Sequence, residues 1–273
     1  MEAINNVVLA VSNFLYQPFI LPVILLVGGL YFTIRTGGVQ IRMFKECLRV
    51  VTEKPKTENG ISSFGALMVS TASRVGTGNI IGVATAVICG GSGAIFWMWL
   101  SAFLGGASAF IESTLAQIYK KKNADGSSYG GPAFYMRDAL NARWLGVIFS
   151  VLIIFTYAIG YNMLAAFNLQ STFKVFSFYG DRTPAIIGAI LAVLFGAVVI
   201  GGAHRLVKVT GVLVPVMGIV YVAISLIVLV LNIGNIPAMF AGIFKNAFDF
   251  QAIFGCFAGS CIMFGIKRGL YSN

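Results

Sequence analysis

The sequence predicts an all-α protein that crosses a membrane several times, because charged residues are scarce and leave long apolar stretches between them. Only 10% of the 273 residues are charged and 58% are hydrophobic, and the mean hydropathy is +0.88. Soluble domains carry roughly one-quarter charged residues, so this chain has too little polar surface to coat a soluble globule. Five long stretches lack Asp, Glu, Lys and Arg altogether, namely 3–34, 75–111, 144–173, 183–203 and 209–244.

Each of these stretches is long enough to cross a bilayer as a helix, which requires roughly 20 apolar residues. Lipid offers no hydrogen-bond partners, so a spanning backbone must be helical or form a closed barrel. The stretches do not show the alternation of polar and apolar residues that is typical of barrel strands. We therefore expect seven helical segments, at residues 14–34, 61–88, 93–119, 144–172, 183–203, 207–231 and 251–270.

Lys and Arg residues are sorted between the two sides of this predicted topology. Loops 35–60 and 120–143 and the short turn 204–208 carry six, five and two of them, whereas the other side carries only three. Cytoplasmic loops are typically rich in Lys and Arg. We therefore expect loops 35–60 and 120–143 in the cytoplasm, the N-terminus outside, and the chain in the plasma membrane. The net charge of +10 could indicate a nucleic-acid partner, but this sorting argues against one.

The predicted connections carry turn signals. Gly90–Gly93 and residues 123–128 are typical of turns, and Gly130-Gly131-Pro132 should end any helix before an amphipathic stretch on the cytoplasmic surface. Residues 232–250 suggest a short outer cap. His204 is expected to face solvent in the turn 204–208, with proton coupling as the alternative.

The four cysteines lack metal-binding spacing and no catalytic triad or HExxH motif occurs, so neither zinc nor an enzyme is predicted.

The segment 61–88 carries an unusual group of residues at its middle, Ser-Arg-Val-Gly-Thr-Gly-Asn at 73–79. A glycine weakens a helix by roughly 1 kcal/mol relative to alanine, and an arginine at the membrane centre costs about 2.5 kcal/mol or more. We therefore expect a discontinuous helix, unwound at Gly76 and Gly78. Freed N–H groups suit a carboxylate, and freed carbonyls with the Asn79 side chain suit Na⁺. Close helix packing on small residues is the alternative interpretation.

Other polar residues within the predicted spans are candidates for the same site. Glu112 is a candidate partner for Arg74, although it could also be anchored near the headgroups. Gln170 lies at the outer end of its segment and could close a binding site from outside, or could simply form an interfacial polar cap.

Several motifs together resemble the alanine or glycine:cation symporter family of bacteria and archaea, a sodium:alanine symporter-like family. The motifs are RVGTGNIIGVA at 74–84, GAIFWMW at 93–99, ESTLA at 112–116, GGP at 130–132 and GIKRGLYSN at 265–273. The resemblance implies a leucine-transporter-like core of two inverted five-helix repeats. Within one transmembrane domain, 1–273, it implies an extra N-terminal helix (14–34), a first repeat (61–231) and the start of a second repeat (251–273), the C-terminal repeat being largely missing.

The resemblance also implies sodium-coupled symport of alanine or glycine, with Na⁺ as coupling ion and no other cofactor. The residues that match the unwound helix and would hold the substrate are Gly76, Thr77, Gly78 and Asn79. The carbonyls of Ala72 and Val75, with the Asn79 oxygen, would bind Na⁺, and Gln170 looks like a substrate contact. Because the chain ends within a family motif, a truncated non-transporting remnant and a structural or channel-like membrane subunit are the alternatives.

Overall fold

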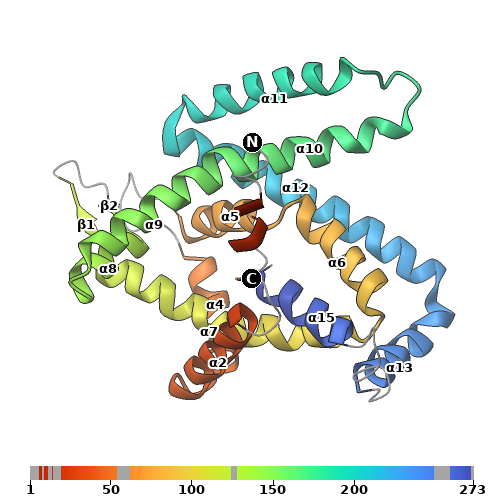
Figure 1. Ribbon diagram of the computed structural model, residues 1–273, viewed down its shortest axis with the longest axis horizontal. Helices are drawn as coiled ribbons and strands as arrows, with labels where there is room; N and C mark the ends of the chain where they lie inside the picture. The colour runs from red at the N-terminus through yellow and green to blue at the C-terminus, as the bar shows by residue number, and fades with distance from the viewer. Residues whose placement is uncertain are drawn as a thin grey trace. The chain divides into compact units, whose positions relative to one another are not determined.

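The computed structural model describes residues 6–7, 9–11, 14, 20–53, 62–123, 128–248 and 259–271. These residues are mostly helical (Figure 1). They divide into two compact units, each described here by itself. Unit 1 comprises Met1–Val50, Gly78–Ala109 and Met217–Asn273, and unit 2 comprises Val51–Thr77 and Phe110–Val216.

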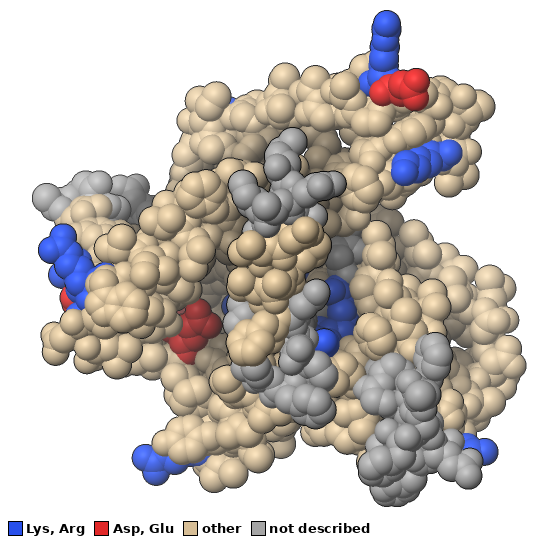
Figure 2. All heavy atoms as spheres, viewed as in Figure 1, with Lys and Arg blue, Asp and Glu red and all other residues tan. Residues whose placement is uncertain are grey.

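Among the described residues, three helices are long and apolar enough to cross a membrane, namely α7 (Ala94–Ile118), the run Arg143–Val175 and α12 (Gly202–Leu231). The helices α5 (Ser63–Arg74) and α6 (Thr77–Gly90) together form a fourth, interrupted candidate. The prediction of a mostly helical protein with several apolar helices suited to crossing a membrane is therefore confirmed. On the face shown in Figure 2, charged residues cover only small areas, as the composition leads one to expect.

The run Arg143–Val175 consists of four helical pieces that follow one another directly along the chain. They are α9 (Arg143–Phe155), a π-helical stretch η1 (Thr156–Tyr161), α10 (Asn162–Thr172) and a 3₁₀ turn η2 (Phe173–Val175). The remaining elements are α2 (Ile20–Arg35), α3 (Val39–Arg42), α4 (Phe44–Val51), β1 (Lys121–Lys122), β2 (Ser128–Tyr129), α8 (Pro132–Ala139), α11 (Thr183–Val199), η3 (Ile233–Asn235), α13 (Ile236–Ala247) and α15 (Gly259–Tyr271).

Unit 1 contains the buried apolar core of the described chain, around the first half of α7. The buried hydrophobic residues are Val39, Ala86, Ala94, Met98, Ala107, Ile243 and Ala247. The start of α7 is held by α13: the Trp97 indole N–H donates to the Ala247 carbonyl at 3.2 Å, and the Asn246 amide donates to Ser92 Oγ at 2.8 Å. The Phe96 ring lies 4.9 Å from that of Phe248, which adds an edge-to-face aromatic contact.

Unit 2 contains the amphipathic helix α8, which lies beside α9, and the helices α10 and α11, which lie side by side (Figure 1). Antiparallel strands β1 and β2 precede α8, with Lys121 opposite Tyr129. Pro132 occupies the first turn of α8, where its missing N–H leaves no hydrogen bond unmade. Burial, and to a lesser extent the negative charge of Glu112, raise the pKa of Tyr135 on α8.

Several connections differ from the sequence prediction. The turn predicted at 204–208 is wrong: the chain turns at Ile200–Gly201, Gly202 adopts the left-handed φ of 71°, and α12 already includes His204. Glycine permits this sharper and earlier turn. The predicted loop 35–60 contains α3 and α4, and the sequence did not predict β1 and β2. Parts of three predicted segments, at 15–19, 61 and 251–258, lie outside the described residues, as do residues 124–127 of the predicted turn.

Candidate functional site

The predicted interruption of the segment 61–88 is present at Gly76, but the expectation that Gly78 is unwound is wrong, because Gly78 already lies within the next helix. Helix α5 ends at Arg74, Val75 takes extended angles (φ −87°, ψ 102°), and α6 begins at Thr77. The Val75 N–H still donates to the Thr71 carbonyl at 2.8 Å, which closes the last turn of α5. The helix is therefore broken over two residues, at the place where the sequence concentrates glycine and polar residues.

A break of this kind exposes backbone groups of both polarities. The last four carbonyls of a helix and its first four N–H groups have no partners within that helix. At the end of α5 this applies to carbonyls that include Ala72, and at the start of α6 it applies to the N–H groups of Thr77, Gly78 and Asn79. The aligned peptide dipoles make the start of α6 favourable for an anion. One stretch of chain therefore offers carbonyl oxygens for a cation and N–H groups for a carboxylate.

The surroundings of Gly76 bear on the packing alternative. Within the described part of the chain, no atom lies within 4 Å of the position that a Cβ on Gly76 would take. Among the described residues, therefore, no neighbouring helix approaches closely enough to require glycine here. Six residues later the situation is different, because a Cβ on Gly82 would overlap the guanidinium group of Arg268. Gly82 thus has a close neighbour, the mobile end of a long side chain, whereas Gly76 has none among the described residues.

The predicted site residues are distributed over both units, whose boundary falls between Thr77 and Gly78. In unit 2, Ala72, Val75 and Gly76 are exposed, with Val75 at 56%. In unit 1, Asn79 is half-buried near the start of α6. The exposure of Thr77 and Gly78 is not described.

Gln170 is buried in unit 2 near the end of α10. The Tyr179 hydroxyl donates to its Oε1, and its Nε2 donates to Ser171 Oγ at 3.0 Å. Both polar atoms of the amide are therefore engaged, and each still has the capacity for one further hydrogen bond, so a ligand can bind Gln170 without replacing these partners. Tyr179 lies in the connection between α10 and α11, and no periodicity in the sequence pointed to it.

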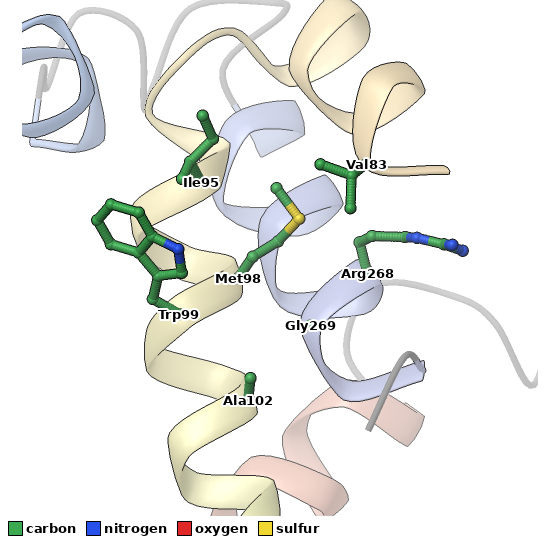
Figure 3. Close-up of a pocket in the computed structure, with 7 residues that line it drawn as sticks. All are labelled: Val83, Ile95, Met98, Trp99, Ala102, Arg268 and Gly269. Carbon is green, nitrogen blue, oxygen red and sulfur yellow. The ribbon is translucent and has the colours of Figure 1, made fainter. Parts of the chain in front are cut away.

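A cavity of about 220 Å³ lies within unit 1, and Figure 3 shows its lining. Ile95, Met98, Trp99 and Ala102 come from α7, Val83 from α6, and Arg268 and Gly269 from α15. The lining is apolar apart from the single guanidinium group, and it includes none of the predicted site residues.

Helix α15 approaches α7 closely beside this cavity because two of its glycines are four residues apart. A Cβ on Gly265 would lie 2.5 Å from the Ala94 carbonyl oxygen, and one on Gly269 would lie 2.6 Å from that of Met98. Small residues at this spacing are typical of contacting helices in membranes. The sequence analysis quoted both glycines within a motif but did not use their spacing, which was the available signal.

These features define a multi-spanning α-helical membrane protein with an interrupted helix, an arrangement found in secondary transporters. The sequence model of the sodium:alanine symporter family matches residues 1–273, and the chain belongs to this family. The predicted family is thereby confirmed.

Relatives with known names agree with this assignment. The chain is 41% identical over 275 residues to the probable sodium/glutamine symporter GlnT of Bacillus subtilis (strain 168), covering 100% of this chain and 57% of that protein. It is 42% identical to the amino-acid carrier protein AlsT of the same strain, covering 98% and 57%. It is 39% identical to the sodium/alanine symporter AgcS of Methanococcus maripaludis, covering 98% and 60%. The chain thus spans somewhat over half the length of these curated relatives, which are transporters rather than enzymes.

Proposed function

We propose that this protein carries out sodium-coupled symport of a small neutral amino acid, alanine or glycine, across the plasma membrane. The observation that carries the proposal is the interruption between α5 and α6 in a chain of the sodium:alanine symporter family. The relatives named as sodium symporters and an amino-acid carrier support the same class of activity.

The proposed site uses the backbone groups that the interruption frees. The N–H groups and side chains of residues 76–79 hold the amino acid, with its carboxylate at the start of α6. The carbonyls of Ala72 and Val75 and the side-chain oxygen of Asn79 bind Na⁺. A cation beside the substrate carboxylate raises the affinity for the substrate, and by linkage the substrate raises the affinity for the cation equally. This reciprocity is the physical basis proposed for coupling.

Gln170 is proposed to contact the substrate from a second helix. Its hydrogen bond from Tyr179 holds the amide in one orientation, so Tyr179 acts as a positioning residue for Gln170. Exchange of this hydrogen bond for one to the substrate would leave no buried amide group without a partner.

The proposed architecture follows the family resemblance. It has a leucine-transporter-like core, with an extra helix at 14–34, a first repeat at 61–231 and the start of a second repeat at 251–273. The N-terminus is proposed to lie outside and loops 35–60 and 120–143 in the cytoplasm, because these loops carry most of the Lys and Arg residues.

The test is uptake of radiolabelled alanine, glycine and glutamine by proteoliposomes that contain the full-length protein, expressed from its complete open reading frame. An imposed Na⁺ gradient should drive accumulation of alanine or glycine, and replacing Na⁺ with K⁺ should abolish it. Preference for glutamine would overturn the proposed substrate, and uptake driven equally by a proton gradient would overturn the proposed ion. Absence of uptake of all three would favour a structural or channel-like role.

A further inference from the structure

A second cavity, of about 320 Å³, lies within unit 2 as a groove between α8 and α9. Its apolar lining includes Phe134 from α8 and a stripe on α9 formed by Val147, Val151 and Ile154. These three residues recur at intervals of four and three, so they lie on one face of the helix. All three are largely exposed, at 55%, 46% and 62%.

The groove depends on the close approach of the two helices at its end. A Cβ on Gly146 would lie 2.7 Å from the Ala133 carbonyl oxygen, so glycine allows α8 to lie directly against the first turn of α9. The Ser150 hydroxyl, which also lines the groove, donates to the Gly146 carbonyl at 2.9 Å. Its polar group is thus satisfied within α9, and the wall beyond Gly146 is effectively apolar.

Positive charge is concentrated at the same end of the groove. Arg143 is the first residue of α9, and Arg137 lies in the last turn of α8, three residues before the connection to α9 begins. The Arg137 guanidinium lies 4.9 Å from the centre of the Phe134 ring and forms two hydrogen bonds with Asp138, at 2.6 and 3.1 Å. Lys121 Nζ lies 3.6 Å from the same carboxylate. Arg137 and Lys121 therefore share one carboxylate, and Arg143, which also lines the groove, adds a further positive charge at this end.

The charges and the apolar stripe occupy different depths of the proposed membrane. The candidate span begins at Arg143, and Ile154 lies eleven residues further along, or about 16 Å at about 1.5 Å per residue. Trp144, next to Arg143, is 66% exposed, and tryptophan is enriched where headgroups meet the hydrocarbon. The arginines thus lie at the level of phosphate groups and the stripe at the level of acyl chains.

We propose that this groove binds an anionic phospholipid of the cytoplasmic leaflet, with its phosphate on Arg137 and Arg143 and one acyl chain along Val147, Val151 and Ile154. Basic pockets beside membrane helices on the cytoplasmic side suit such headgroups. The proposal rests on the predicted cytoplasmic position of loop 120–143 and does not depend on the identity of the transported substrate.

The experiment measures lipid retained by the full-length protein, by native mass spectrometry after titration with phosphatidylglycerol or phosphatidylcholine. The wild type should bind phosphatidylglycerol in preference. The double variant Arg137→Gln/Arg143→Gln should lose affinity for it by roughly 30-fold, which corresponds to about 2 kcal/mol for two cations. The matched control is Arg205→Gln/Lys208→Gln, which removes two exposed cations predicted on the same side of the membrane and should change little.

Two further variants test separately how the charge and the apolar wall of the groove contribute to lipid binding. Asp138→Asn releases Arg137 from its carboxylate partner and should strengthen phosphatidylglycerol binding about threefold. Val151→Phe places a larger side chain in the groove and narrows it without changing its charge. This variant should weaken binding of the same lipid. Equal binding of the two lipids by the wild type, equal losses in the two double variants, or unchanged binding in Val151→Phe would overturn the proposal. The last result would show that the polypeptide, and not a lipid chain, covers the groove.

Discussion

Gly76 and Gly269 each belong to a pair of glycines in an apolar segment, but their surroundings are opposite. Around Gly76, no described atom lies within 4 Å of a Cβ position, and the helix is broken. Around Gly269, a Cβ would meet Ser101 Oγ and the Met98 backbone, and helix α15 continues without a break. We propose that glycine in the first region frees backbone groups, whereas in the second it allows two backbones to approach closely. Composition alone does not separate these roles.

The different surroundings of these two glycines predict whether a substitution changes ligand binding or folding stability. Substitutions near the interruption should change ligand binding more than folding, because few contacts are lost there. Substitutions of the α15 glycines should change folding, because protein interiors have little space for added atoms.

The largest expected effect is on transport in Asn79→Ala. Removing the proposed ligand for Na⁺ and substrate should lower the initial rate of Na⁺-driven alanine uptake by roughly 10- to 100-fold, since hydrogen bonds to charged groups contribute about 1.5–3 kcal/mol. Thr85→Ala is the matched control on α6, because that exposed hydroxyl donates to the Ile81 carbonyl of its own helix. Equal rates in the two variants would remove Asn79 from the site.

The next effect is on stability in Gly269→Ala. The added methyl group has to displace Ser101 or the α7 backbone, so we expect a loss of about 1–3 kcal/mol in the free energy of unfolding. The control is Gly28→Ala on α2 in the same unit, where a Cβ would meet nothing within 4 Å. Thermal unfolding in detergent checks both, and Gly28→Ala should be neutral or slightly stabilising. Similar unfolding temperatures for the two variants would contradict the packing role of Gly269.

Gly76→Ala should show the converse behaviour. Its unfolding temperature should stay within about 2 °C of the wild type, because a surface change without lost contacts is usually within about 0.5 kcal/mol. Alanine uptake should nevertheless fall several-fold, because alanine favours the helix that the interruption has to break. The same proteoliposome and unfolding measurements apply. A large loss of stability with normal uptake would assign Gly76 to packing after all.

The smallest effect lies outside both regions, at the exposed pair of Arg137 and Asp138. The hydrogen bond from Arg137 is the main reason that the pKa of Asp138 lies below its usual value. The stability that this pair contributes is present above the unfolded pKa of about 4 and is lost as the pH falls through the lower folded pKa. The small difference in unfolding temperature between wild type and Asp138→Asn should therefore disappear in acid. A difference that persists or grows below pH 4 would contradict this assignment.

The sequence predicted the apolar helices well, because the length of each charge-free stretch can be compared directly with the number of residues that a helix needs to cross a bilayer. It also predicted the interruption, since Arg74 and Asn79 are poorly suited to an unbroken span. It did not predict the contact of α15 with α7, because glycine spacing shows that a helix can approach a neighbour but not which one. The bond between Tyr179 and Gln170 was missed for a similar reason: its two residues meet through a connection that has no periodicity. The early start of α12 depended on one left-handed glycine, Gly202.

The most direct test of the central claim is ligand-induced stabilisation of the purified full-length protein. If the freed backbone groups and Asn79 bind alanine together with Na⁺, alanine should raise the unfolding temperature in Na⁺ but not in K⁺, because a ligand stabilises only the state that binds it. Asn79→Ala should show no such shift, and Thr85→Ala should show the full one. An alanine-induced shift that is independent of Na⁺, or one that survives in Asn79→Ala, would contradict the proposed site.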